Sequence, residues 1–454
     1  MNKYIKYTIA PLLAILLLTS CGVVTKTYKQ PERKVADGLY RDINSSDTTT
    51  LADKPWQELF SDPLLQKLIQ EALDQNLDLK SAIERMNAAQ ATLTQRRLSL
   101  LPSLNGSADV SGGNKKSTLW EAGLTASWEL DVWGKLTSSK KAALAVYLQT
   151  DAAHRAIQTA LISNIANSYY TLLALDEKLA ITNQTIKVRV KDVESMKLLK
   201  ESAVVNGAAV VQSQANLYSA EVSIPDLQQS IRETENALCT LLGRTPGNIK
   251  RGMLAQQAPK TDLHVGIPSQ LLSNRPDVQE AELALREAFE NVNVAKASFY
   301  PSITITANGG LSSSSLSDIL DHSLFYNLLG GLTQPIFNNG QVRANLKIAQ
   351  SKQQQAYYHF KQSMLTAGEE VSNAIYAYQM AEKKETSRTK QLVALEKSVD
   401  FTKELLRYSS ATNYTDVLTS EQSLLSAQLA SVTDRLQKLQ SVVSLYRALG
   451  GGWK

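Results

Sequence analysis

The sequence predicts a mixed α and β membrane protein in which long helices accompany a small set of β-strands. Three observations support this fold class. Apolar and polar residues alternate strictly over positions 120–132, residues 137–203 contain neither Pro nor Gly, and similar segments recur about 200 positions apart.

The alternating segments predict two pairs of strands. Every second residue of 120–132 is apolar, and its expected partner runs over about 104–110; the second pair is expected at 303–307 and 328–336. The alternation of apolar and polar residues alone also fits a soluble β hairpin with one solvent-exposed face. Four strands cannot close a membrane barrel, whose smallest size is about eight strands, so a membrane role requires several chains to share one barrel.

The helices are expected to be unusually long and to pair as coiled coils. At 1.5 Å per residue, segment 137–203 approaches about 100 Å if unbroken. Apolar residues spaced by three and four form seams at Leu172, Leu175, Leu179, Thr182, Ile186 and Val193, at Leu392, Leu395, Val399, Thr402 and Leu406, and at Leu418, Leu425, Leu429, Val432, Leu436, Leu439 and Val443. We expect Pro225 to kink the helix that contains it.

An internal duplication explains the length of the chain. Asp78 and Asp277 are 199 positions apart, as are Pro102 and Pro301, whereas later pairs such as Gly243 and Gly450 are 207 positions apart. We therefore expect a first repeat at 61–250 and a second at 251–454, each made of a helix, a β hairpin and two long helices.

The N-terminus has the features of a lipoprotein leader. Lys3 and Lys6 precede an apolar run over 9–18 that is too short to span a bilayer, and small residues lead directly to Cys21. This predicts a signal peptide at 1–20 and a lipidated, extended segment at 21–60, with a covalent lipid on Cys21 that supplies stable anchoring in the outer-membrane lipid. An ordinary signal peptide followed by a chance Cys is the alternative.

Composition argues against several other classes of protein. The formal charge is +5, and about +3 without the leader. The chain is therefore nearly neutral and lacks the strongly basic character that is typical of nucleic-acid-binding proteins. Lipidation of Cys21 would leave only Cys239, so we expect no intramolecular disulfide. The four His residues show no metal-ligand spacing, and no nucleophile or acid–base motif appears, so we expect no metal, no cofactor and no enzymatic activity.

Many short motifs together resemble the lipoprotein branch of the TolC-like outer membrane factors. They span essentially all of the mature chain and include residues 28–31, 56–64, 126–134, 242–247, 266–278, 299–302, 334–337 and 449–453. The resemblance implies a homotrimer with a 12-stranded outer-membrane β-barrel, four strands per chain, continued by a periplasmic tunnel of 12 long helices. It also implies an exit duct of a tripartite efflux pump, with a periplasmic adaptor and an inner-membrane, proton-driven transporter of the resistance-nodulation-division type as partners. A duct for type I protein secretion is the alternative within this family.

Two helix–helix turns resemble the periplasmic tips of this family, where acidic rings constrict the closed duct. Asp416 matches the first acidic position, but Thr419 occupies the second, and Asn413 stands where some members carry a basic residue. The gate candidates are thus Asn413, Tyr414, Asp416 and Thr419, and the adaptor-facing candidates are Asn206, Gly207, Ala208, Thr412 and Thr415. Two interpretations stay open: Asn413 and Asp416 form only a helix cap, or the cap also contributes a ring of three carboxylates.

Two further classes of protein share some of these features. A structural periplasmic lipoprotein explains the leader and the heptads but not four amphipathic strands in duplicated positions. A periplasmic adaptor is also lipidated and coiled, but it should carry one helical hairpin with compact β modules rather than two β hairpins about 200 residues apart.

Overall fold

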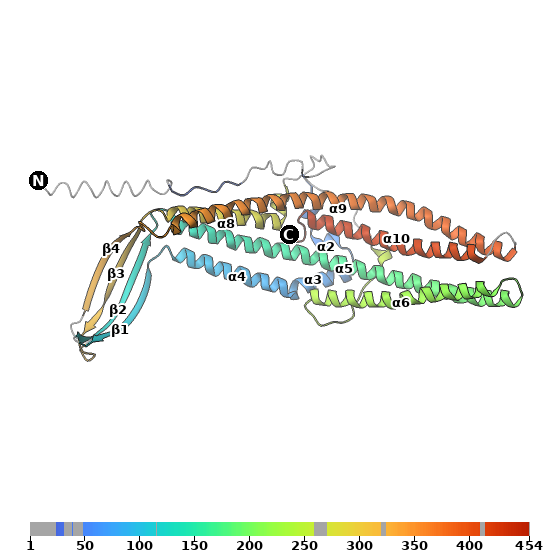
Figure 1. Ribbon diagram of the computed structural model, residues 1–454, viewed down its shortest axis with the longest axis horizontal. Helices are drawn as coiled ribbons and strands as arrows, with labels where there is room; N and C mark the ends of the chain where they lie inside the picture. Colours follow the sequence, from blue (N-terminus) through green and yellow to red (C-terminus); the bar gives the residue numbers. More distant parts are fainter. Residues whose placement is uncertain are drawn as a thin grey trace. The chain divides into compact units, whose positions relative to one another are not determined.

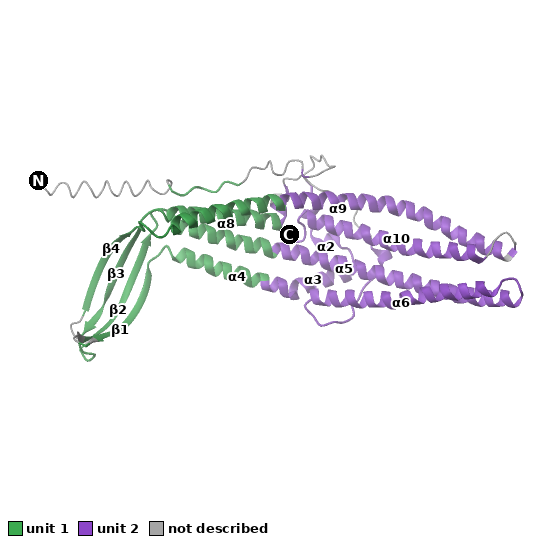
Figure 2. Cartoon of the chain, viewed as in Figure 1, with its two compact units in different colours: residues 1–35, 82–154, 277–363 green, residues 36–81, 155–276, 364–454 purple. Residues whose placement is uncertain are grey.

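The computed structural model describes residues 24–30, 39, 49–114, 116–257, 270–318, 324–408 and 414–453. The chain forms two compact units (Figure 2). Unit 1 comprises residues 1–35, 82–154 and 277–363, and unit 2 comprises residues 36–81, 155–276 and 364–454. Each unit contains segments from both halves of the chain, so the compact units do not follow the predicted repeats, whose boundaries stay a prediction.

Helices dominate the described residues (Figure 1). The helices and strands are η3 (Leu51–Asp53), α2 (Trp56–Leu59), α3 (Pro63–Gln75), α4 (Leu77–Leu98), β1 (Ser103–Gly113), β2 (Lys116–Leu130), α5 (Lys135–Glu201), α6 (Gly207–Leu241), η4 (Leu254–Gln256), α7 (Leu271–Asn274), α8 (Pro276–Ala297), β3 (Ser302–Ser313), β4 (Leu324–Thr333), α9 (Gln341–Tyr408) and α10 (Tyr414–Ala448). Over the described residues, no helix combines the length and the apolar character needed to cross a membrane.

The four strands form one antiparallel sheet in unit 1, in the order β1-β2-β3-β4 (Figure 1). Leu124 in β2 pairs with Gly106 in β1 and with Gly309 in β3, which in turn pairs with Tyr326 in β4. The expected strands are thus all present, and their mutual pairing places the two hairpins side by side. Strands β1 and β4 lie at the two edges of the sheet, so each pairs with only one other strand among the described residues.

Two of the predicted strands, β2 and β4, end earlier along the chain than the sequence pattern predicts. Strand β2 ends at Leu130 rather than at 132, because the Asp131 carboxylate accepts hydrogen bonds from the backbone amides of Leu136 and Thr137 (2.8 and 2.7 Å) and so caps the start of α5. Strand β4 covers Leu324–Thr333 rather than 328–336, and it ends just before Pro335, which lacks a backbone donor for a further ladder bond.

The register separates an apolar face of the sheet from a face that is mainly polar on β1, β2 and β3. Because side chains alternate along each strand, paired residues share a face. The apolar face carries Leu104 and Val110 of β1, Trp120, Leu124 and Trp128 of β2, Ile303, Ile305 and Leu311 of β3, and Leu324, Tyr326, Leu328 and Leu332 of β4. The opposite face carries Asn105, Ser107 and Asp109, Glu121, Thr125 and Ser127, Thr304, Thr306 and Asn308, and Asn327, together with the apolar Leu119 of β2 and Phe325 and Leu329 of β4.

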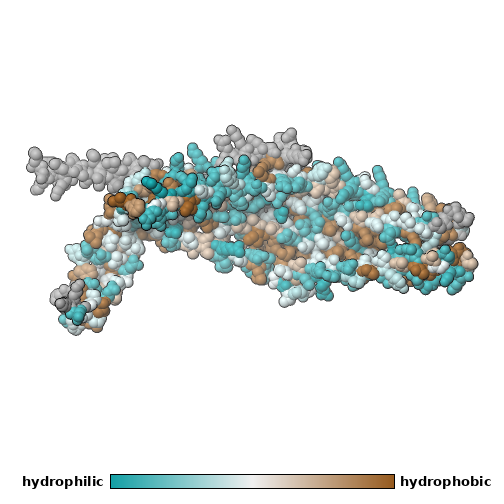
Figure 3. Space-filling view, in the orientation of Figure 1, coloured by the Kyte–Doolittle hydropathy of each residue, from teal (hydrophilic) through white to brown (hydrophobic). Residues whose placement is uncertain are grey.

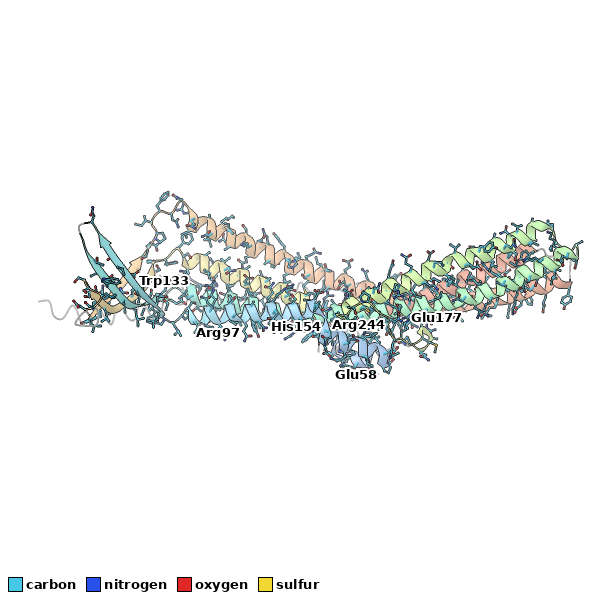
Figure 4. The ribbon with its side chains drawn as sticks, turned by 90° about the horizontal axis from the view of Figure 1, so that it is seen from below. Glu58, Arg97, Trp133, His154, Glu177 and Arg244 are labelled. Atoms are coloured by element: carbon cyan, nitrogen blue, oxygen red, sulfur yellow. The ribbon has the colours of Figure 1, made fainter. Side chains whose placement is uncertain are left out.

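Aromatic side chains gather where the strands meet the helices of unit 1. Trp133 lies at this junction (Figure 4), where its ring stacks on Tyr300 with 4.9 Å between centroids and its Nε1 donates to the Pro301 carbonyl (2.7 Å). Hydrophobic side chains are also visible at the junction in Figure 3, and Ile336 and Phe337 there are 98% and 84% exposed. Amphipathic aromatic rings at one level are typical of a membrane–water interface.

An equivalent hydrogen bond, from a side chain to a carbonyl at the end of a long helix, occurs in unit 2 in both halves of the chain. Asn76 Nδ2 donates to the carbonyl of Leu241 (2.9 Å), and Arg275 Nη1 donates to the carbonyl of Ala448 (2.9 Å). The donors are 199 positions apart and the acceptors 207, which are the two offsets of the sequence repeat. The glycine that ends each final helix, Gly243 or Gly450, has a positive φ (67° and 86°) of the kind that favours glycine.

The long helices carry apolar seams as expected. The side chains of Leu172, Thr182 and Val193 in α5 and of Leu425, Val432 and Leu439 in α10 are buried. Helix α6 includes Pro225 in its interior, so one turn of it lacks a backbone donor. Helix α6 pairs with the last part of α5, and α10 pairs with the last part of α9 (Figure 1).

Candidate functional site at the helix tips

Some of the predicted site residues lie outside the described part of the chain. They are the lipidation candidate Cys21 and, in the turn between α9 and α10, Thr412 and Asn413. The remaining gate and adaptor-facing candidates lie in unit 2, at the turn between α5 and α6 and at the start of α10.

The first tip joins α5 to α6 through a short turn. Ala203 has a positive φ of 58°, and the backbone amide of Val204 donates to the carbonyl of Leu199 (2.9 Å), which closes the end of α5. The Asn206 side chain then accepts a hydrogen bond from the amide of Ala209 (3.1 Å) and caps α6. Gly207 and Ala208 follow in the exposed first turn, where a partner can reach them.

The second tip presents an exposed polar face at the start of α10. Thr415, Asp416 and Thr419 are all exposed, and residues three positions apart share one face of a helix. The Thr419 hydroxyl donates to the carbonyl of Thr415 (2.8 Å), so it is satisfied within its own helix. Asp416 lies in the first turn, where the helix dipole favours a negative charge.

Tyr414 connects the two tips rather than facing outward. It is 7% exposed, and its hydroxyl donates to Ser213 Oγ in α6 (2.8 Å). Its ring belongs to a small apolar cluster with Met196, Val210 and Val417, which come from three different helices. The first turn of α10 is therefore held against α5 and α6 by both packing and a hydrogen bond.

Four charged residues near the tips link the two helix pairs. We call Arg189 and Asp192 of α5, Lys403 of α9 and Glu421 of α10 the inter-helix cluster. Lys403 Nζ lies 2.5 Å from Glu421 Oε1 and 3.8 Å from Asp192 Oδ1. Arg189 donates through Nη2 to Gln422 Oε1 (2.7 Å) and through Nη1 to the carbonyl of Asn216 in α6. The cluster thus joins α5, α6, α9 and α10 at one level.

Burial raises the pKa of Asp192 to about 6, and the nearby carboxylate of Glu421 adds to the rise. Lys403 and Arg189 oppose this shift because their positive charges favour the ionised carboxylate. The pKa of Arg189 is lowered, chiefly by burial. The protonation of Asp192 can therefore change in the mildly acidic range.

The inter-helix cluster was missed by the sequence interpretation, although a signal for it exists. Arg189 falls three positions after Ile186 and four before Val193, which is a seam position of the coiled coil. Glu421 stands likewise three after Leu418 and four before Leu425. Charged residues at seam positions are costly unless they find partners across the helix interface, so their presence could have indicated the cluster.

No arrangement of three or more His, Cys, Asp or Glu side chains suited to a metal ion occurs within the described residues. Cys239 is buried in α6, and its Sγ lies 3.4 Å from the carbonyl oxygen of Gly247, which is compatible with its expected role as a small core residue.

Comparison with known proteins supplies the family. Residues 68–244 and 267–451 match the family described as Outer membrane efflux protein. The chain is 31% identical to the probable efflux pump outer membrane protein TtgC of Pseudomonas putida (96% of this chain, 94% of that protein) and 30% identical to the probable outer membrane lipoprotein SilC of Salmonella typhimurium (97% of each).

Solved structures agree with the sequence relatives. The open-state MtrE outer membrane channel of Neisseria gonorrhoeae superposes with a TM-score of 0.86 at 29% identity, covering 95% of this chain and 98% of that one. The predicted fold class, a mixed α and β chain with a four-stranded sheet and long helices like these outer-membrane channels, is confirmed. The chain belongs to the family of outer membrane efflux proteins, the outer-membrane channel components of efflux pumps.

Proposed function

We propose that this chain forms, as a homotrimer, the outer-membrane exit duct of a tripartite pump that moves drugs or other small molecules from the periplasm to the exterior. A periplasmic adaptor would contact the helix tips, and an inner-membrane, proton-driven transporter would select the cargo. The duct itself would be a passive conduit that catalyses no reaction, and the two repeats would each supply half of its wall.

The observation that carries this proposal is the sheet of unit 1. One face is apolar on all four strands, as a surface against lipid requires, and the opposite face is mainly polar on β1, β2 and β3. A sheet edge inside a membrane must be paired, because no water is present to satisfy its backbone groups. Three copies joined between β4 of one and β1 of the next would satisfy every edge with a single repeated contact.

Assembly and cargo can be tested separately. Native mass spectrometry of the full-length protein in detergent is expected to give three copies, and any other count would contradict the duct. In the source bacterium, deletion of the gene is expected to increase sensitivity to organic biocides or metal salts. If deletion instead abolishes export of a protein and leaves that sensitivity unchanged, the type I secretion alternative is correct.

We also propose that Cys21 carries the lipid anchor. Cys21→Ser is expected to abolish labelling of the protein by a radioactive fatty acid, because serine cannot form the thioether, while the strands still allow some membrane insertion. Cys239→Ser is the matched control, since it removes the buried cysteine and should keep full labelling. Undiminished labelling of Cys21→Ser would exclude lipidation at this residue.

For the gate, we propose that three copies of Asp416 converge near the axis of the trimer. Their like charges would attract cations into the constriction. Asp416→Asn keeps most of the capping geometry and removes the charge, so in planar bilayers it is expected to weaken cation preference and block by divalent ions with little loss of thermal stability.

Two companion variants separate the gate from the helix cap. Asp416→Ala should lose both selectivity and stability, whereas Thr419→Ala, on the same exposed face, should leave the cation preference unchanged. If Asp416→Asn leaves selectivity and divalent block intact while Asp416→Ala only lowers stability, Asp416 is a cap and the constriction lies elsewhere.

A further inference from the structure

A groove of about 980 Å³ lies in unit 1, between residues 25–29 and the helices α5, α8 and α9. This volume is near the upper end of the range of about 300–1,000 Å³ that is typical of small-molecule sites. Over the described residues, no Asp or Glu lines the groove. Its apolar part is formed by Tyr28, Leu285, Phe289 and Tyr357, and its cationic part by Lys26, Lys29 and Lys141.

The segment that carries two of these lysines is held on α8 by other groups. Asn293 Oδ1 accepts a hydrogen bond from the backbone amide of Lys26 (3.2 Å), and Asn293 Nδ2 donates to the carbonyl of Lys26 (2.9 Å). The ring of Tyr28 packs edge-on against Phe289 with 5.5 Å between centroids. The ammonium groups of Lys26 and Lys29 therefore take no part in fixing the segment.

The three lysines are exposed, and none forms an ion pair within the described part of the chain. The part of α8 that contacts the segment carries three carboxylates, but each accepts a hydrogen bond from an amide side chain outside the groove. These pairs are Glu282 with Gln30 (3.0 Å), Glu287 with Asn291 (3.3 Å) and Glu290 with Asn293 (3.1 Å). The groove therefore presents positive charge that a bound anion can balance.

The groove begins close to the aromatic junction between the sheet and the helices. Thr25 lies against Gly134, the residue after Trp133, since a Cβ on that glycine would lie 3.2 Å from Thr25 Cγ2. Lys141 is the seventh residue of α5, about 9 Å along the axis from its first residue. The polar headgroup layer of a bilayer is about 5–8 Å thick, and a lysine stem can extend the ammonium group toward it. The lysines nearest the sheet can thus reach lipid phosphates.

We propose that this groove binds an anionic phospholipid of the adjoining membrane leaflet, with the phosphate on the lysines and the lipid's apolar part against the aromatic and aliphatic wall. Basic pockets beside membrane-spanning segments recognise such headgroups through the same charge complementarity. The level of the groove at the membrane rests on the proposed function, which places the sheet in the bilayer. Binding of the lipid by the purified protein is independent of that placement.

Two lipids with the same acyl chains test the proposal. Native mass spectrometry of the full-length protein in detergent is used to titrate dioleoylphosphatidylglycerol, which is anionic, and dioleoylphosphatidylcholine, which has no net charge. The first phosphatidylglycerol is expected to bind at least tenfold more tightly, and equal affinity would overturn the proposal. Glycerol 3-phosphate at about 1 mM is expected not to bind. If it binds as tightly as phosphatidylglycerol, the groove recognises a free phosphate and the assignment to a lipid is wrong.

Lysine variants locate the binding. Combining Lys26→Met with Lys141→Met is expected to weaken phosphatidylglycerol binding about 25-fold, because each lysine near an anionic lipid contributes about fivefold. Combining Lys26→Arg with Lys141→Arg keeps both charges and should keep the affinity. Lys140→Met is the matched control, since it removes the neighbouring cation of α5, which does not line the groove, and should change nothing.

A change on the opposite wall guards against a folding defect. Gln354 of α9 is exposed and lines the groove, so Gln354→Glu adds a negative charge without removing a lysine and should weaken phosphatidylglycerol binding about fivefold. Gln354→Leu should leave the preference for phosphatidylglycerol over phosphatidylcholine unchanged. Affinity that is insensitive to both Gln354→Glu and the lysine-to-methionine pair would contradict a site in this groove.

Planar bilayers separate the groove from the duct. A protein that forms channels but binds both lipids equally would refute the groove and leave the proposed function intact. A protein that prefers phosphatidylglycerol through Lys26 and Lys141 but forms no channel would refute the proposed function and leave the groove intact.

Discussion

Lys403→Met is expected to lower the free energy of unfolding by about 3 kcal/mol at pH 8. The reason is that Lys403 is the cation paired with both Glu421 and Asp192 in the inter-helix cluster. Its removal leaves two carboxylates close together in a partly buried site, and an uncompensated buried charge costs more than the intact pair contributes. Chemical denaturation of the full-length protein, followed by far-ultraviolet circular dichroism, measures the change. Lys384→Met, which removes an exposed cation of the same helix, should stay within about 0.5 kcal/mol.

The effect of Lys403→Met should depend on pH in a defined direction. The pKa of Asp192 is raised from 3.8 to about 6 in the folded protein, so between about pH 4 and pH 6 the folded state holds a proton that the unfolded state has released. The contribution of Asp192 therefore increases stability as the pH falls through this window and decreases it as the pH rises. Without Lys403 the carboxyl binds its proton more readily, so the defect should be smaller at pH 5 than at pH 8.

Asp192→Asn provides the control for this assignment. The amide imitates the protonated carboxyl, so the variant should be at least as stable as the wild type at pH 8 and should lose the part of the pH dependence that lies between about pH 4 and pH 6. If Lys403→Met is equally destabilised at both pH values, or if Asp192→Asn keeps the full slope, the pH dependence comes from another group.

The elements that could be predicted are those set by local pattern. Alternation over 120–132 indicated β2, and the lack of Pro and Gly over 137–203 indicated α5, because each depends only on neighbouring residues. The ends of the strands were less accurate. The end of β2 is set by the Asp131 carboxylate, which bonds amides five and six residues farther on. A helix cap of this kind ends the strand early. The alternation of apolar and polar residues gives no sign of it.

The candidate site was predicted less completely than the fold. The polar face with Asp416 and Thr419 follows from the sequence of one helix. The inter-helix cluster does not, since Asp192 and Lys403 are more than 200 positions apart and come together only when two coiled coils pack. The burial of Tyr414 against Ser213 has the same origin, because its partner lies in the other half of the chain.

Gly450→Ala is the second variant for which we expect a large effect, a loss of about 3–4 kcal/mol in the free energy of unfolding. Gly450 has a φ of 86°, which costs an L-residue about 1–2 kcal/mol. An added Cβ would also lie 2.3 Å from the carbonyl oxygen of Asn274. That oxygen cannot move freely, because it accepts a hydrogen bond from Trp453 Nε1 (2.9 Å).

Gly452→Ala separates the cost of the positive φ from the cost of the steric overlap between the added Cβ and a carbonyl oxygen. Gly452 also has a positive φ (102°), but its Cβ would meet no atom closer than 3.4 Å, so this variant should suffer the backbone strain alone and lose about 1–2 kcal/mol. Gly243→Ala repeats the test in the first half, where the Cβ would lie 2.6 Å from the carbonyl of Gln75. If the contact is equivalent in the two halves, Gly243→Ala and Gly450→Ala should be similarly destabilised and both more so than Gly452→Ala. A Gly450→Ala protein as stable as Gly452→Ala would mean that the helix end can shift away from α7, and that the repeated contact does not hold the core together.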